Sequence, residues 1–143
     1  KPIFFDDFVY WDNNSLDIEK MTNSAQALLG KHDFSSFRSS SCGSNNPVKE
    51  IKSIALIQEG PFLILNISAT AFLHNMVRII AGTLLGISKG DLDITIPELL
   101  EARDRTLAGK TLTAKGLFFL GPRYDAEVPI NSPFKDIISR FDI

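Results

Sequence analysis

The chain has 143 residues, of which 44% are hydrophobic and 22% charged, so its composition is that of one folded domain and not of a disordered protein. Its net charge of −2 does not favour nucleic-acid binding, and its single cysteine, Cys42, excludes an internal disulfide framework. No secretory signal is present, and the longest apolar run, residues 76–87, is interrupted by Arg78 and too short to span a bilayer. We expect a single cytoplasmic domain over residues 1–143, without a membrane segment.

The first predicted element is a helix over residues 15–29. Ser15 is a suitable N-cap, apolar residues then recur at helical spacing, and Gly30 provides the stop. Residues 31–47 are rich in serine and asparagine and long for a connection within a compact domain. They predict an irregular loop that is either mobile or functional, and a functional loop would present Arg38 to an anionic ligand.

Three segments predict an antiparallel sheet. Residues 48–58 and 62–69 are joined by Glu59-Gly60-Pro61, which indicates a hairpin, and residues 117–124 have the composition of a last short strand. A sheet of these strands, covered on one face by the helix at 15–29 and a second helix, makes an α+β fold.

The second helix is predicted over residues 73–88. A third helix, over about 95–103, opens with the capping box Thr95-Ile96-Pro97-Glu98. A polar loop is expected over residues 104–116, and residues 134–140 have weak helical character.

Arg78 is the one charged residue in an otherwise apolar part of the helix at 73–88. A guanidinium needs an anion or a set of carbonyls to receive its donors. Its neighbours one turn away form a stripe that is mostly polar or small: His74, Asn75, Ala81, Gly82 and Leu85. The glycines at 82, 86 and 90, which follow one another at four-residue steps, would also let another segment approach the backbone closely.

Two interpretations of this stripe stay open on the helix pattern alone. In the first, the stripe faces a cleft in which Arg78 meets an anion. In the second, Arg78 forms an internal ion pair, and the candidate partners are Asp33, Asp91, Glu101 and Asp104.

Other motifs for metal binding, cofactor binding or catalysis are absent from the sequence. Cys42 and the two histidines, His32 and His74, give no zinc-binding set at usable spacing, and no phosphate-binding loop, dinucleotide-binding motif or nucleophile elbow occurs. We therefore expect no metal and no cofactor. Residues 103–123 hold five bases and one acid, which make either a phosphate-binding face or an ordinary solvated surface.

Three blocks taken together resemble the C-terminal half of the TruA-type family of tRNA pseudouridine synthases. They are GKHDFSSFRSSSC, ATAFLHNMVRIIAGTLLGISKG and LLEARDRTLAGKTLTAKGLFFLGPRYD, in the family's order. The resemblance covers about residues 15–125, and the helix block, with its A-F-L-H-x-M-V-R string, is the most specific of the three.

The resemblance implies an enzyme that isomerises uridine to pseudouridine in the anticodon arm of tRNA, without metal or cofactor. The family's catalytic aspartate lies in an Arg-Thr-Asp motif of the N-terminal half, and no Arg-Thr-Asp occurs in this sequence. The chain is therefore expected to be the C-terminal half and inactive by itself. Its expected partners are tRNA, the N-terminal domain of the same protein and a second copy in a homodimer.

By the same resemblance, Arg78 matches the family arginine that pairs with the catalytic aspartate. A fixed guanidinium would orient that carboxylate and lower its pKa. The residues that would line the uridine pocket are His74, Gly116, Leu117, Phe118 and Phe119. The residues that would hold tRNA phosphates are Arg38, Arg103, Arg105, Lys110 and Lys115.

Two other functions fit the same residues. One is a non-catalytic RNA-binding module that has kept the scaffold. The other is a structural α+β dimerisation domain in which Arg78 only bridges to Asp33 or Asp104. An Arg-Thr-Asp-bearing domain encoded upstream of Lys1 would favour the enzyme over both.

Overall fold

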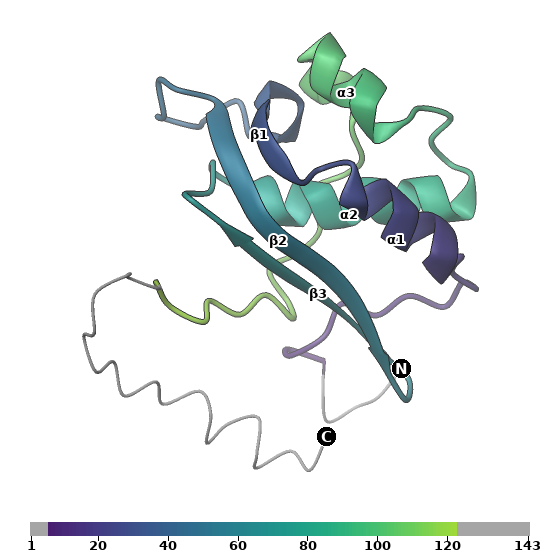
Figure 1. The fold of residues 1–143 in the computed structure, drawn as a ribbon. Coiled ribbons are helices and arrows are strands. Elements are labelled where there is room, and N and C mark those ends of the chain that lie inside the picture. The colour runs from purple at the N-terminus through teal and green to yellow at the C-terminus, as the bar shows by residue number, and fades with distance from the viewer. Residues whose placement is uncertain (1–5, 123–143) are drawn as a thin grey trace.

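The computed structural model describes residues 6–122, which form three α-helices, three strands and two 3-10 helices (Figure 1). In chain order they are α1 Ile18–Gln26, β1 Gly30–Asp33, η2 Ser35–Phe37, β2 Val48–Glu59, β3 Phe62–Ala69, α2 Met76–Lys89, α3 Ile96–Ala102 and η3 Arg105–Leu107. The α+β fold predicted from the sequence is confirmed.

The sheet has the order β1-β2-β3 and both of its pairings are antiparallel. The predicted hairpin is confirmed as β2 and β3, which pair Ile54 with Ile67 and Leu56 with Leu65. The register shifts between Ile51 and Ser53, so β2 carries a bulge there. Because of this bulge, Ile51 and Ile54 can both be buried in the core although they lie three positions apart.

The third strand of the sheet is β1 and not the segment that the sequence predicted. Residues 117–122 form no regular secondary structure and pair with no strand of the described chain, so the strand predicted at 117–124 is wrong over this range. Gly116 and Gly121 bound the apolar run with positive φ angles, and proline at 122 has no N–H for a sheet hydrogen bond. The rest of that strand and the weak helix at 134–140 lie outside the described residues.

The helices begin and end differently from the predicted bounds. The N-cap of α1 is Asp17, which accepts a hydrogen bond from the Lys20 N–H at 2.9 Å, so the prediction of Ser15 as the cap is wrong. The carboxylate of Asp17 caps the helix two residues later, and Gly30 starts β1 instead of closing α1. The capping box at the start of α3 is confirmed, with Thr95 and Glu98 bonded in both directions.

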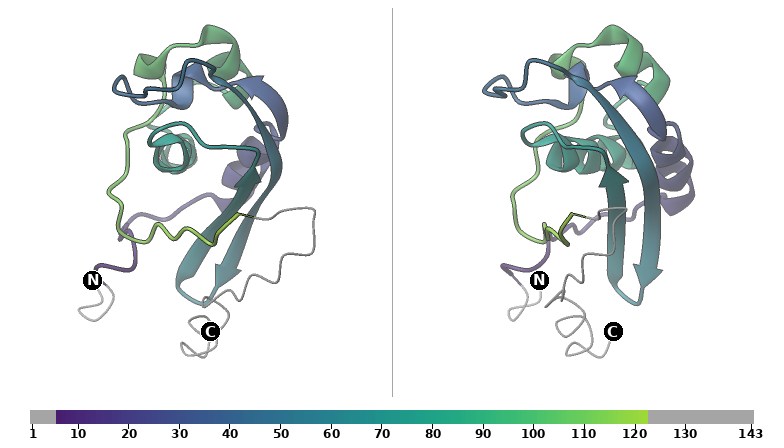
Figure 2. Two further views of the ribbon diagram at one scale, coloured as in Figure 1. Left: turned by 90° about the vertical axis from the view of Figure 1, so that its left-hand side faces the viewer. Right: turned by 60° about the vertical axis from the view of Figure 1, so that its left-hand side comes forward.

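The core lies between one face of the sheet and the helices. In Figure 2 the sheet bends around α2, which lies on its concave side. The helix α1 contributes Met21 and Ala25 to the same core, and Leu28 follows just after the helix. Other wholly buried apolar side chains include Phe34, Phe37, Ile79, Ile80, Leu84 and Leu99. The prediction that two helices cover one face of the sheet is confirmed.

Residues 108–112, called the strap below, lie directly against α2. A Cβ added at Gly82 would penetrate the backbone carbonyl of Lys110, and the N–H of Gly109 donates to the buried Thr83 Oγ1 at 2.9 Å. At Gly86 an added Cβ would lie 2.7 Å from Leu92 Cδ1, so the Leu92 side chain also packs closely on α2. The predicted close approach is confirmed at Gly82 and Gly86, but it is wrong at Gly90, where an added Cβ would meet nothing within 4 Å.

Among the helices that the structure describes, none has the length and apolar character needed to cross a membrane.

Candidate active site around Arg78

The start of α2 is set by a residue in an uncommon backbone conformation. Asn75, the N-cap, has φ 62° and ψ 7°, in the left-handed region that asparagine tolerates better than other residues with a side chain. An asparagine at this position usually accepts a hydrogen bond from the first turn of its helix, but Asn75 makes no such bond. Its side chain faces Arg78 instead.

Two acceptors hold the Arg78 guanidinium. The Nη1 group donates to Asn75 Oδ1 at 2.7 Å, and Nε donates to the carbonyl oxygen of Leu112, in the strap, at 2.6 Å. The Leu112 N–H donates in return to the Arg78 carbonyl at 3.3 Å. The half-buried side chain is therefore fixed from its own helix and from the strap.

No carboxylate of residues 6–122 forms an ion pair with Arg78. Of the four proposed internal partners, Asp33 instead lies 3.4 Å from Arg103 Nε, and Asp104 caps η3 through the Thr106 N–H at 2.8 Å. The internal ion pair considered from the sequence is thus not formed within the described chain. The guanidinium has five N–H donors, and its hydrogen bonds there occupy two of them.

The helical stripe does not face a cleft along its whole length. Gly82 and Leu85 are buried, and the strap covers Gly82, so this part of the cleft prediction is wrong. The small residue at position 82 allows the strap to pack closely on α2. The sequence pattern alone cannot distinguish such packing from a cleft, because small residues suit both. The accessible end is the start of α2, where His74 is exposed.

His74 is joined to the loop that follows η2. Its Nδ1 lies 3.2 Å from Ser41 Oγ, its carbonyl accepts from the Ser39 N–H at 3.1 Å, and its own N–H donates to Cys42 Sγ at 3.4 Å. That N–H is also the main reason that the pKa of the Cys42 thiol lies below its ordinary value. The serine-rich loop is therefore positioned beside the start of α2.

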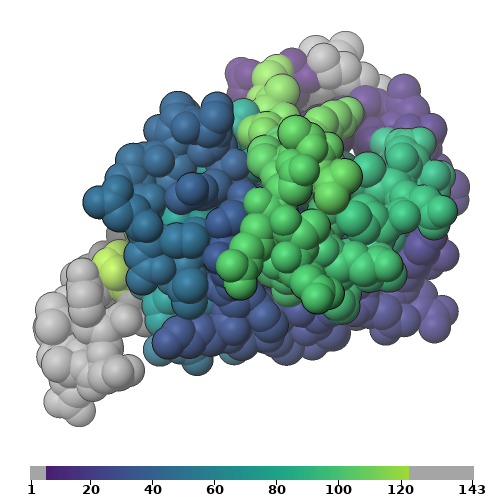
Figure 3. Space-filling model, turned by 90° about the horizontal axis from the view of Figure 1, so that it is seen from above, coloured from purple at the N-terminus to yellow at the C-terminus, as the bar shows by residue number. Residues whose placement is uncertain are grey.

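The predicted phosphate-binding residues occupy two neighbouring segments, as Figure 3 shows for residues 38–47 and 103–115 on one face of the molecule. Arg38 donates to the Ser44 carbonyl at 3.2 Å. Arg103 is 66% exposed beside Asp33. Arg105 donates to the carbonyl of Ala108 and to Thr111 Oγ1, so it also supports the strap.

The two lysines of this set are already engaged within the chain. Lys110 lies 5.7 Å from the centre of the Tyr10 ring, and that phenol raises the pKa of the lysine. Lys115 forms an ion pair with Asp6 at 2.6 Å, which raises its pKa, and lies 3.5 Å from Asp7. The basic residues thus lie in one region, but Asp6 and Asp7 neutralise part of the charge of Lys115.

The segment predicted to line a uridine pocket is mostly exposed. Gly116, with φ +78°, packs against the backbone of residues 8–10. The side chains of Leu117, Phe118 and Phe119 are exposed, Phe119 to 72%. Exposed apolar residues in a row are typical of a surface that another chain segment or ligand covers.

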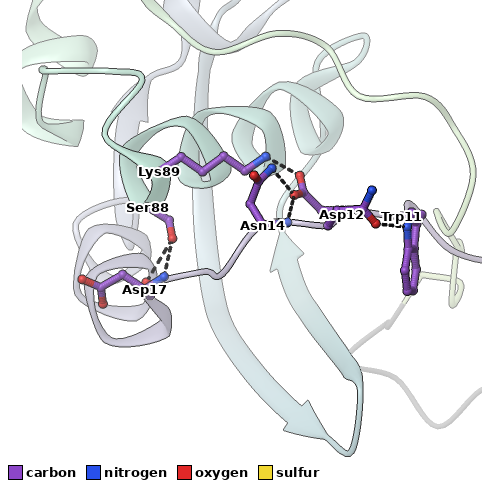
Figure 4. Close-up of polar contacts among 7 residues, drawn as sticks. Trp11, Asp12, Asn14, Asp17, Ser88 and Lys89 are labelled. Carbon is purple, nitrogen blue, oxygen red and sulfur yellow. Dashed lines mark hydrogen bonds and ion pairs between the residues drawn. The ribbon is translucent and has the colours of Figure 1, made fainter. Parts of the chain in front are cut away.

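A polar network that the sequence did not predict holds the N-terminal segment at the far end of α2 (Figure 4). Asp12 forms an ion pair with Lys89, and the Asp17 N–H donates to Ser88 Oγ at 2.6 Å. Burial raises the pKa of Asp12, but the hydrogen bonds from Lys89 and Asn14 outweigh it and leave that pKa below its ordinary value. These partners are more than seventy positions apart, so no local sequence pattern could have paired them.

The residues that sequence reasoning missed at the site itself are Asn75 in its role toward Arg78 and the backbone carbonyl of Leu112. The three-residue spacing of Asn75 and Arg78 places them on one face of a helix, and this spacing was the available signal for their contact. Nothing in the sequence indicates the contact of Arg78 with the Leu112 carbonyl. No group of three or more potential metal ligands gathers in residues 6–122.

Residues 6–122 thus form an α+β domain that presents an arginine without a carboxylate partner from the described part of the chain. Comparison with known proteins gives the family. The model of the tRNA pseudouridine synthase family matches residues 24–125, and the chain belongs to this family.

Relatives with known names agree with the family assignment. The chain is 44% identical over 124 residues to tRNA pseudouridine synthase A of Francisella tularensis subsp. novicida, covering 86% of this chain and 48% of the relative. It is 43% identical over 122 residues to tRNA pseudouridine synthase A of Bordetella petrii, covering 85% and 46%. The chain thus spans about half the length of the curated relatives it matches.

Proposed function

We propose that the protein to which this chain belongs isomerises uridine to pseudouridine in the anticodon arm of tRNA, and that this chain supplies the C-terminal half of its active site. The observation that carries the proposal is the Arg78 guanidinium. It is fixed by Asn75 and Leu112, it keeps unused donors, and it has no carboxylate partner among residues 6–122.

In this proposal a catalytic aspartate from the N-terminal domain pairs with Arg78. A guanidinium beside a carboxylate favours the charged form, so it lowers the pKa of the aspartate and keeps it ready to attack. Since two acceptors already fix the guanidinium, it can orient the carboxylate at little further entropic cost. The reaction needs no metal or cofactor.

The target uridine must leave its stack to reach the aspartate, which costs a few kcal/mol and favours an RNA loop over a duplex. We assign His74 and the segment Gly116–Phe119 to the pocket for the flipped base. The exposed aromatic rings of Phe118 and Phe119 offer faces on which a base can stack. The proposed assembly is a cytoplasmic homodimer.

The direct test compares this chain with the full-length protein. We expect tritium release from [5-³H]uridine-labelled tRNA only when the N-terminal domain is present, because the chain has no Arg-Thr-Asp. Adding the separately produced N-terminal domain should restore part of the activity. Turnover by residues 1–143 alone would contradict the assignment of the nucleophile to the other half, and an inactive full-length protein that still binds tRNA would favour the non-catalytic module.

Phosphate binding can be tested at Arg103 without disturbing the fold. Arg103 caps α3 with φ 51°, a conformation that glycine adopts without strain, and its exposed ion pair with Asp33 contributes little to stability. In the full-length protein, Arg103→Gly should weaken tRNA binding and reduce the slope of log K against log salt by about 1, while kcat is retained.

The control for Arg103→Gly is Lys52→Gln, which removes one exposed charge at the β2 bulge. We expect Lys52→Gln to leave the salt slope as in the wild type. Equal slopes for Arg103→Gly and the wild type would remove Arg103 from the proposed RNA contacts.

A further inference from the structure

Asn75 combines three features that its position at a helix start does not require. It has a left-handed backbone, it makes no capping bond, and its side-chain oxygen accepts from Arg78 Nη1 at 2.7 Å. We propose that Asn75 is a positioning residue that aims the Arg78 guanidinium at the catalytic carboxylate. The proposal rests on the function proposed above.

The two acceptors decide which edge of the guanidinium is available. The Leu112 carbonyl takes the Nε donor at 2.6 Å, so it blocks the edge formed by Nε and one terminal nitrogen. Asn75 takes one of the two donors of Nη1. The other donor of Nη1 and both donors of Nη2 have no partner in residues 6–122, and the carboxylate therefore binds end-on, across the two terminal nitrogens.

The backbone conformation of Asn75 indicates that its side chain serves the contact with Arg78. Glycine adopts φ 62° with no steric cost, so the backbone alone would favour glycine at this position. Asparagine there gives up a cap bond and makes the bond to Arg78 instead. Because Arg78 has only one other acceptor in the described chain, loss of the amide would leave the guanidinium free to turn about the bond to Leu112.

The test is Asn75→Gly in the full-length protein, because this substitution removes the amide and keeps the backbone conformation. We expect kcat for pseudouridine formation to fall about 10- to 100-fold with little change in KM for tRNA, since the lost contact acts in the chemical step. The melting temperature should not fall. The acidic limb of the pH–rate profile should move to higher pH, because a misaligned guanidinium lowers the pKa of the aspartate less.

A double-mutant cycle shows whether the effect passes through Arg78. Asn75→Gly should cost little in an Arg78→Lys background, because the guanidinium that it positions is already gone. The control is Lys52→Gln at the exposed bulge of β2, for which kcat should equal that of the wild type.

The outcomes separate this inference from the proposed function. A wild-type protein that forms no pseudouridine overturns both. An active wild type with kcat and pH profile unchanged by Asn75→Gly, or with additive effects in the cycle, overturns the role of Asn75 and leaves the proposed function standing.

Discussion

Gly82→Ala is expected to lower the free energy of unfolding by about 3 kcal/mol or more. The added methyl group would overlap the carbonyl of Lys110, which is backbone and cannot move aside as a flexible side chain could. Overpacking a well-packed site costs about 1–3 kcal/mol, and a clash with backbone lies at or above the upper end of that range. The strap would have to leave α2, with loss of the bond from the Gly109 N–H to Thr83 Oγ1.

The free energy of unfolding of Gly82→Ala is measured by chemical denaturation of the full-length protein, with a spectroscopic signal that reports the unfolding of this domain. Gly43→Ala is the matched control, because an added Cβ there meets nothing within 4 Å, and its stability should equal that of the wild type or exceed it slightly. A Gly82→Ala protein with wild-type stability would show that the strap does not lie on α2 as described.

The strap also links this packing to the site. Leu112, which holds Arg78 by its carbonyl, follows Lys110 by two residues. Displacing the strap would therefore remove the Nε acceptor, and Gly82→Ala should lose activity beyond what the unfolded fraction accounts for. Thus the close contact that makes glycine necessary at 82 also determines where the guanidinium lies.

Most local features of the fold could be predicted from the sequence, although the cap at Ser15 was wrong, and most features that depend on distant residues could not. The β2–β3 hairpin and the capping box of Thr95 and Glu98 involve neighbours in the chain, and both are present. The strand β1 has the polar sequence GKHD and forms by pairing with β2, so its own residues gave no strand signal. The apolar segment after Gly116 had the opposite property: its composition is that of a strand, but among the described residues it pairs with none.

The site shows the same division. Helical spacing placed His74, Asn75 and Arg78 at one end of α2, which the structure bears out. The acceptor from Leu112 lies 34 positions from Arg78 and is a backbone carbonyl, which every residue has, so the sequence could not predict it. The charge count of residues 103–123 likewise could not show that Arg105 supports the strap or that Lys115 pairs with Asp6.

Arg78→Lys in the full-length protein is expected to reduce kcat about 100- to 1000-fold while KM for tRNA changes little. Lysine keeps the positive charge, but its single nitrogen cannot bond to Asn75 and Leu112 and also present two parallel donors to a carboxylate. Loss of one preorganised charge-stabilising group costs about 2.7–4 kcal/mol in other enzymes, which corresponds to this range.

The comparison of kcat with KM decides what Arg78 does. An arginine that only bound tRNA phosphates would give a raised KM with kcat unchanged, and lysine would replace it well, because a phosphate contact needs charge more than a fixed fork. If Arg78 holds the catalytic aspartate, its replacement by lysine lowers kcat and shifts the acidic limb of the pH–rate profile to higher pH, because the aspartate then takes up its proton more readily.

Lys52→Arg, the reverse exchange at the exposed bulge of β2, is the control and should change neither kcat nor KM. A wild-type kcat for Arg78→Lys would mean that the guanidinium serves only the packing of the strap, through its bond to Leu112.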